Sequence, residues 1–80
     1  NAICPGFVMT PLIEKQIEII MDKKKISFEE ASEALCSDKH PNGKLGNPDD
    51  LGALAAFICS NSAGQMTGSS YSMDGGWTAI

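Results

Sequence analysis

An apolar run at the start of the chain and a segment rich in serine near its end both stop at turn residues. The run over residues 1–4 ends at Pro5-Gly6, and because proline cannot continue a central strand, it predicts the end of a buried strand. The run over residues 67–73 is closed by Asp74-Gly75-Gly76 and predicts a second strand. Apolar residues between these runs recur at spacings of three and four, which is typical of helices.

The first half of the chain predicts two helices with clear start signals. Residues 11–25 place apolar side chains at helical spacing, with Thr10 as the N-cap and Pro11 as the first helical residue. Ser27 begins a capping box, so a second helix is expected from there to residue 37 or 38. Residues 39–46 contain proline, asparagine and two glycines, and this composition predicts a loop.

The third predicted helix has the most apolar sequence of the three. Asn47 is its expected N-cap, Pro48 its first residue, and the two aspartates that follow suit the positive end of the helix dipole. Residues 51–59 are almost wholly apolar or small. We therefore expect this helix to be buried on a broad face.

The order of the elements (strand, two helices, helix, strand) predicts an α/β fold. Strands joined by long helical connections pair in parallel, and parallel sheets normally have several strands between layers of helices. Two strands cannot form such a sheet alone, and the chain begins at Asn1 inside an apolar run. We therefore expect this sequence to be part of a longer polypeptide that supplies the remaining strands.

Charge and composition argue against several classes of partner. The 80 residues carry six lysines, no arginine and a net charge of −4. A nucleic-acid-binding protein needs a basic face, in which arginine is preferred, so nucleic acid is not expected as a partner. The sequence also has no apolar run of about 18 residues, so we expect no membrane-spanning segment.

The cysteines and the single histidine do not form a pattern that binds a metal. Cys4, Cys36 and Cys59 are widely spaced and contain no Cys-x-x-Cys pair, so we expect reduced thiols in a reducing compartment, with Cys4 and Cys59 filling small apolar holes. His40 lies in a Lys-His-Pro-Asn-Gly sequence and is expected to be a residue of a surface loop.

Four segments, taken in order, resemble the C-terminal third of the short-chain dehydrogenases/reductases. They are NAICPGFVMTPL (1–12), LGNPDDL (45–51), TG (67–68) and MDGGW (73–77). Each is common alone, but the ordered set is specific and spans essentially the whole chain. The resemblance implies that residues 1–80 are the C-terminal fragment of one NAD(P)-binding domain, part of a Rossmann-type doubly wound parallel sheet.

Residues 10–17 and 75–79 are most similar to the family members that oxidise D-3-hydroxybutyrate. This similarity implies reversible oxidation of (R)-3-hydroxybutyrate, a small hydroxy acid, to acetoacetate. It also implies NAD as the cofactor, with NADP as the alternative, and a cytoplasmic homotetramer. A 3-oxoacyl thioester reductase, a sugar alcohol dehydrogenase and a non-catalytic scaffold or assembly fragment remain as alternatives.

The resemblance assigns five residues near the first strand to the cofactor. Pro5 and Gly6 match the turn that lies against the nicotinamide ring, where a missing side chain allows close approach. Val8 matches the residue whose backbone N–H and C=O pair with the carboxamide. Thr10 matches a hydroxyl that hydrogen-bonds the carboxamide or pyrophosphate, and can also cap its helix. Leu12 completes this set.

Two residues are assigned to the substrate by the same resemblance. Gln16 matches an amide that donates to the substrate carboxylate, although residues alone also allow a polar position on an exposed helix face. Trp77 matches a residue that closes the pocket near the methyl end, with a hydrophobic plug or an interface residue as the equal alternative. Residues 7–45 would contain a lid of two helices that swings over the substrate.

The family's catalytic and phosphate-binding residues are not in this sequence. The family uses a Ser-Tyr-Lys set and a Gly-rich turn at a helix N-terminus. Tyr71 is not the catalytic tyrosine, because the position four residues later is Gly75 rather than lysine. We therefore expect no catalytic residue here, and no catalysis by the 80-residue chain alone.

Overall fold

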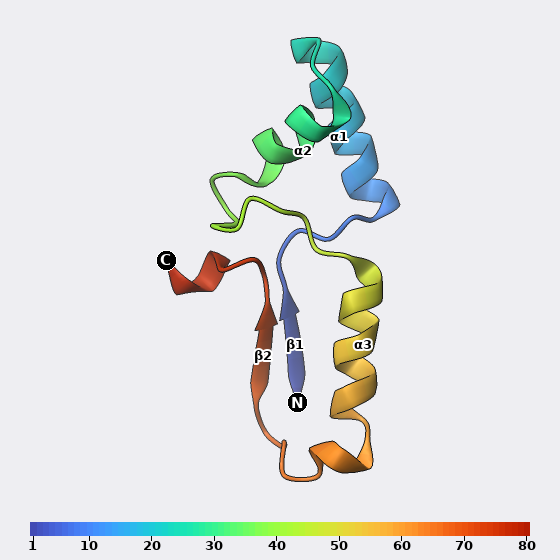
Figure 1. The fold of residues 1–80 in the computed structure, drawn as a ribbon, viewed down its shortest axis with the longest axis vertical. Helices are drawn as coiled ribbons and strands as arrows, with labels where there is room; N and C mark the ends of the chain where they lie inside the picture. The colour runs from blue at the N-terminus through green and yellow to red at the C-terminus, as the bar shows by residue number, and fades with distance from the viewer.

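The computed structural model describes all 80 residues and contains one parallel pair of strands. Strand β1 (Ala2–Pro5) lies beside β2 (Ser70–Met73), with Ile3 opposite Tyr71 in the register (Figure 1). The parallel pairing expected from the sequence is thus confirmed. The second strand is shorter than residues 67–73, because Gly68 has a φ of 68° and the chain turns there. Pro5 continues the first strand by one residue, opposite Met73.

Helix α3 (Pro48–Ile58) runs alongside the two strands (Figure 1). It begins as predicted, with the side-chain oxygen of Asn47 accepting the Asp49 N–H at 2.9 Å. The expectation of a broad buried face is wrong for this chain, since none of the residues of α3 is buried. Leu51, Leu54, Ala55 and Ile58 on one face of the helix are half-buried, whereas Phe57 is among the exposed large apolar residues.

Helices α1 (Pro11–Lys24) and α2 (Phe28–Cys36) form a hairpin beyond the carboxyl ends of the strands (Figure 1). Thr10 caps α1 by accepting the Ile13 N–H, and Lys25 ends it in the left-handed conformation with a φ of 55°. The capping box at Ser27 is present, so the start of α2 is confirmed.

The buried core is small and lies inside this hairpin. Ile13, Ile17 and Ala31 are buried together, and seven half-buried apolar side chains pack around them (Phe7, Met9, Ile20, Met21, Ile26, Leu35 and Leu45). Because Phe7, Met9 and Leu45 belong to the loops at the strand ends, this core anchors the hairpin to those loops.

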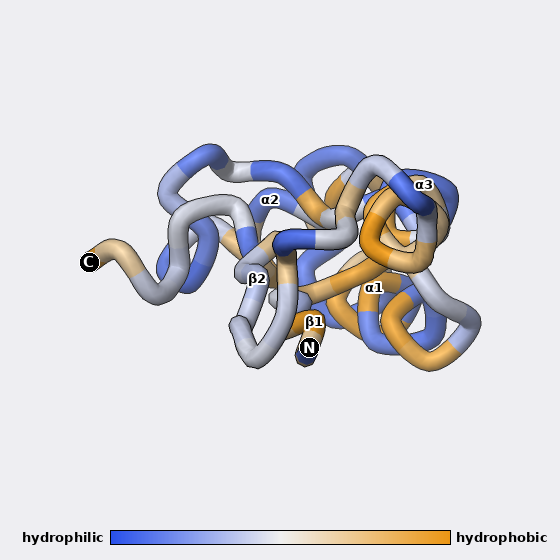
Figure 2. The backbone as a smooth tube through the Cα atoms, turned by 90° about the horizontal axis from the view of Figure 1, so that it is seen from below, coloured by the Kyte–Doolittle hydropathy of each residue, from blue (hydrophilic) through white to orange (hydrophobic).

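The molecule is elongated and has a large surface for its length. Its radius of gyration is 15.0 Å, whereas a compact domain of this length has about 12 Å. Its accessible surface is 5505 Å², against about 4,700 Å² for a compact monomer of this mass. Figure 2 shows hydrophobic stretches along β1 and α3, and no residue of either element is buried within these 80 residues.

The burial of the three cysteines differs from the expectation. Cys4 and Cys59 are exposed rather than packed in apolar holes, and the buried thiol is that of Cys36, at the end of α2. Cys4 lies on β1 and Cys59 follows α3, so both belong to the part of the chain without a covering layer. None of the helices is long and apolar enough to cross a membrane.

Candidate functional site

Three loops converge at the carboxyl ends of β1 and β2. They are residues 6–10 after β1, residues 39–46 between α2 and α3, and residues 74–76 after β2. The first two are tied together by a short parallel bridge. The Gly46 N–H donates to Phe7 C=O at 2.8 Å, and the Met9 N–H donates to Gly46 C=O at 2.9 Å. This end of a parallel α/β sheet is where such folds bind ligands.

The bridge leaves Val8 with a free backbone donor and acceptor. Because the bridge uses Phe7 C=O and Met9 N–H, the peptide N–H and C=O of Val8 itself have no partner in the molecule. Val8 also lines a cavity of about 420 Å³ between the three loops and the start of α3. A half-buried N–H and C=O on one residue are complementary to a carboxamide, which carries one acceptor and one donor group.

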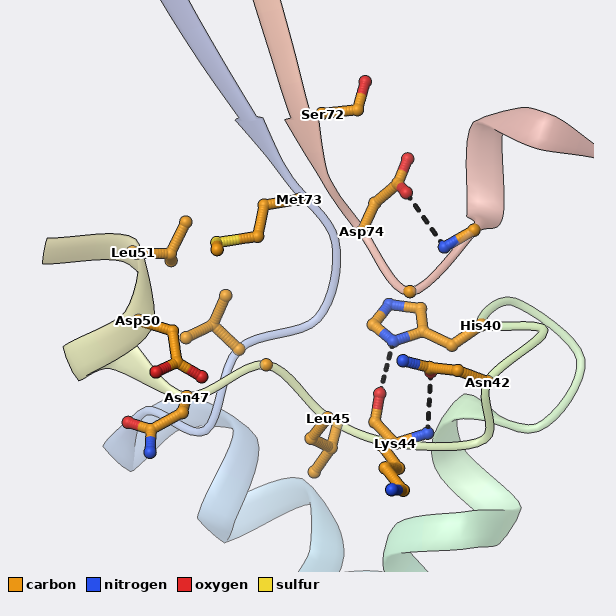
Figure 3. A pocket seen from close by; sticks show the side chains of 14 residues that line it. His40, Asn42, Lys44, Leu45, Asn47, Asp50, Leu51, Ser72, Met73 and Asp74 are labelled. Atoms are coloured by element: carbon orange, nitrogen blue, oxygen red, sulfur yellow. Dashed lines mark hydrogen bonds between the residues drawn. The ribbon is translucent and has the colours of Figure 1, made fainter. Parts of the chain in front are cut away.

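Side chains from several elements line this cavity (Figure 3). Asp50 and Leu51 come from the start of α3, Ser72 and Met73 from β2, and His40 from the loop after α2. The complete lining is Val8, His40, Asn42, Lys44, Leu45, Gly46, Asn47, Asp50, Leu51, Ser72, Met73, Asp74, Gly75 and Gly76. No cluster of three histidine, cysteine or carboxylate side chains that could hold a metal ion occurs.

His40 is buried, which corrects the expectation of a surface loop residue. Only 2% of its surface is exposed. Its Nε2 accepts the Phe7 N–H at 2.9 Å, and its Nδ1 lies 2.6 Å from Lys44 C=O. Since an amide N–H only donates and a carbonyl only accepts, this geometry requires a neutral imidazole with its proton on Nδ1.

Two glycines make room for this imidazole. A Cβ on Gly6 would collide with His40 Nε2 and would lie 3.0 Å from Asp74 Cα. A Cβ on Gly75 would lie 2.9 Å from His40 Nδ1 and 2.6 Å from Asn42 Oδ1. Gly75 also has a φ of 64°, in the left-handed region. Close packing on His40 is therefore a physical reason for glycine at both positions.

Trp77 joins an aromatic cluster with His40 and Phe7. The Phe7 ring lies 5.6 Å from the imidazole and 5.4 Å from the Trp77 ring, centroid to centroid. Lys39 Nζ lies 5.7 Å from the Trp77 ring centroid, in cation–π range. Trp77 thus packs at the edge of the converging loops with 36% of its surface exposed.

Asp74 builds the turn that carries Trp77. Its Oδ1 accepts the Gly76 N–H, and its Oδ2 accepts both the N–H and the hydroxyl of Thr78, at 3.1 and 2.8 Å. The hydrogen bond from the Thr78 hydroxyl is the largest cause that lowers the pKa of this carboxyl, and the Thr78 and Gly76 amides add to it. The tight turn expected after the second strand is confirmed, and Asp74 holds it together.

The other residues assigned from the sequence lie apart from the cavity lining. Pro5 is paired within β1, and Gly6 donates its N–H to Met73 C=O. The Thr10 hydroxyl caps α1 through its oxygen and keeps its proton free. Leu12 is 67% exposed and Gln16 is exposed, both on α1.

Sequence reasoning missed His40 and underrated Asp74. The signal available for His40 was weak, because its main partner Phe7 lies 33 residues away in the sequence. For Asp74, the threonine four residues later in an Asp-Gly-Gly-Trp-Thr sequence was a local signal of a carboxylate cap.

Comparison with known proteins identifies the family of the chain. A family model described as enoyl-(acyl carrier protein) reductase matches residues 1–78. The chain is 49% identical over 79 residues to a D-beta-hydroxybutyrate dehydrogenase of Cupriavidus necator, and 39% identical over 79 residues to one of Rhizobium meliloti. Each match covers 99% of this chain and 31% of the relative.

A solved structure gives the same result for the fold. The crystal structure of a short chain dehydrogenase family protein from Francisella tularensis superposes with a TM-score of 0.79 at 32% identity. The match covers 98% of this chain and 32% of that one. The α/β fold expected from the sequence is thus confirmed as a portion of a Rossmann-type sheet. The chain belongs to the short-chain dehydrogenase/reductase family, and it spans about a third of the length of the relatives it matches.

Proposed function

We propose that this chain is the C-terminal third of an NAD-dependent oxidoreductase that interconverts (R)-3-hydroxybutyrate and acetoacetate. Its contribution is to hold the nicotinamide end of the cofactor and one side of the substrate. The observation that carries the proposal is the free N–H and C=O of Val8 beside the cavity at the strand ends. The names of the relatives from Cupriavidus necator and Rhizobium meliloti support the substrate.

The residues present fit a nicotinamide carboxamide. Val8 N–H would donate to the carboxamide oxygen, and Val8 C=O would accept from its amino group. The Thr10 hydroxyl keeps a proton to donate, because its oxygen is already used by the α1 cap. Pro5, Gly6 and Leu12 complete the cofactor side. When bound, the nicotinamide ring would supply the hydride acceptor for oxidation of the hydroxyl-bearing carbon of the substrate.

The substrate side is proposed to come from the hairpin and the C-terminal turn. Gln16 on α1 donates its amide N–H to the substrate carboxylate, which avoids a buried counter-charge. Trp77 covers the methyl end, held in place by the Asp74 turn and by its packing on Phe7. The segment 7–45, with the α1–α2 hairpin, acts as a lid that excludes water when substrate is present.

The rest of the enzyme must be supplied by a longer polypeptide. The high radius of gyration, the exposed apolar face of α3 and the two-stranded sheet support this proposal. That polypeptide would supply the proton-accepting tyrosine and the phosphate-binding turn. We further propose a homotetramer that uses α3 and β2 at its interfaces, and a reducing compartment in the cytoplasm, which suits three free thiols.

The proposal is tested with the full-length polypeptide and with the 80-residue chain. The full-length protein should oxidise (R)-3-hydroxybutyrate with NAD faster than with NADP and faster than it acts on 3-oxoacyl thioesters or sugar alcohols. The isolated chain should turn over no NAD. Preference for a thioester or a sugar alcohol would overturn the substrate, and turnover by the isolated chain would overturn the fragment assignment.

Gln16→Ala tests the substrate contact within the same enzyme. Loss of a charge-assisted hydrogen bond to the carboxylate should raise the KM for 3-hydroxybutyrate about tenfold or more, with the KM for NAD unchanged. Glu18→Gln, an exposed change on the same helix, is the matched control. Lid closure is tested by hydrogen exchange, where equal protection of residues 11–38 with and without cofactor plus substrate would contradict it.

A further inference from the structure

His40 connects three segments that are far apart in the sequence. Its imidazole bonds Phe7 in the loop after β1 and Lys44 in the loop before α3, and it packs against Gly75 in the turn after β2. In Figure 3 the ring lies between that turn and the 42–45 loop, at the border of the cavity. It is also one of the three largest fully buried side chains of the molecule.

The bonding of the imidazole leaves it no free nitrogen. Nε2 accepts from Phe7 and Nδ1 donates to Lys44, so neither nitrogen can exchange a proton with a ligand while these bonds hold. His40 is therefore suited to holding a backbone in place rather than to acid–base chemistry.

The segment that His40 holds is the one that contains Val8. The Phe7 N–H is fixed by His40, and Phe7 C=O is fixed by the Gly46 N–H. Both polar groups of Phe7 are thus committed, and the peptide plane between Phe7 and Val8 has a defined orientation. That plane carries the Val8 N–H, which points to no partner within the molecule.

We propose that His40 is a positioning residue for the nicotinamide carboxamide, acting through the Phe7–Val8 peptide. This inference rests on the proposed function, because it takes Val8 as the group that binds the cofactor. Through Lys44 and the loop after α2, the same imidazole ties the carboxamide-binding segment to the end of the proposed lid.

Three substitutions in the full-length enzyme separate the two bonds of His40. Gln places its side-chain amide oxygen near the position of Nε2 and can keep the Phe7 bond. Asn reaches only the position of Nδ1 and can keep the Lys44 bond. Leu keeps the apolar volume and neither bond. The readout is the dissociation constant for NADH by equilibrium titration, with the melting temperature measured in parallel.

The Phe7 bond is expected to decide cofactor affinity. His40→Leu and His40→Asn should weaken NADH binding about tenfold, because the orientation of the Val8 amide is lost, while His40→Gln should stay within about threefold of the parent. Cys36→Ala removes another buried side chain, at the end of α2, and neither hydrogen bond of the His40 imidazole involves this residue. It should lower the melting temperature and leave the NADH dissociation constant unchanged.

Other outcomes would overturn the inference. Equal NADH affinity in all three His40 variants, or an Asn variant that binds like the parent while Gln does not, would show that the Phe7 bond has no positioning role. Failure of all three variants to fold would reduce His40 to a structural residue. A parent that binds NADH but does not oxidise 3-hydroxybutyrate would overturn only the proposed substrate, whereas a parent that binds no NADH would overturn both proposals.

Discussion

The imidazole of His40 occupies the space beside Gly6 where a side chain would otherwise lie. A Cβ at this position would collide with His40 Nε2, the atom that accepts the Phe7 N–H. The backbone turn after β1 and the loop after α2 are therefore packed against each other without a gap, and they are joined by a hydrogen bond one residue further along. Glycine at position 6 has a function in packing in addition to any function in cofactor approach.

Gly6→Ala should destabilise the enzyme through this contact. The backbone of Gly6 is not in the left-handed region, so the cost comes from displacing His40 or the β2 end rather than from φ strain. Overpacking at such a close contact costs about 1–3 kcal/mol, measured as the free energy of unfolding in denaturant. A stability of Gly6→Ala equal to that of the parent would contradict the contact.

Val8→Pro tests the free backbone donor of the cavity. Proline removes the Val8 N–H, which has no partner in the chain, and leaves both hydrogen bonds of the Phe7–Gly46–Met9 bridge in place. We expect NADH to bind about tenfold more weakly, with little loss of stability, because one hydrogen bond to the carboxamide disappears. Val8→Ala keeps the N–H and should bind NADH like the parent. Equal affinity of the proline and alanine variants would contradict a role for this N–H.

The Asp74 turn should make stability depend on pH in the acid range. Hydrogen bonding from Thr78 lowers the pKa of the folded carboxyl below its ordinary value of 3.8. A lowered folded pKa contributes stability that is present above the unfolded pKa and is lost as the pH falls through the folded value. Melting temperatures of the parent and Asp74→Asn should therefore differ at pH 6 and converge below about pH 3.8. A difference that stays constant over this range would contradict the effect.

The local signals of the sequence predicted the helix starts correctly. The caps at Thr10, Ser27 and Asn47 could be predicted because each involves residues at most three positions apart. The parallel pairing of the strands also followed from the length of the connection between them. These features depend on short sequence distances or on chain topology, which a sequence shows directly.

The features that were mispredicted depend on partners distant in the sequence or outside it. The burial of His40 depends on Phe7 and Gly75, which no spacing rule connects to it. The apolar composition of α3 predicted burial, but none of its residues is buried within these 80 residues. An apolar sequence shows that a helix can pack against other elements, but it does not show whether those elements belong to the same segment of chain. The roles assigned to Gln16 and Trp77 stay predictions.

The reactivity of the thiols measures how much of the surface of β1 and α3 is covered in the full-length enzyme. Burial raises the pKa of the Cys36 thiol, and that side chain is 1% exposed, so it should react slowly with iodoacetamide whether the chain is isolated or part of the enzyme. Cys4 and Cys59 are exposed on β1 and at the end of α3, and in the isolated chain they should react as fast as thiols of an unfolded peptide.

If further strands and helices pack on this face, both should become protected by at least about tenfold in the full-length enzyme, since modification would then require local unfolding. Mass spectrometry of peptides labelled over time gives the rate for each cysteine separately, and Cys36→Ala removes the slow label without affecting the other two. Rapid labelling of Cys4 and Cys59 in the folded full-length enzyme would contradict the packing of the remaining sheet on β1 and α3.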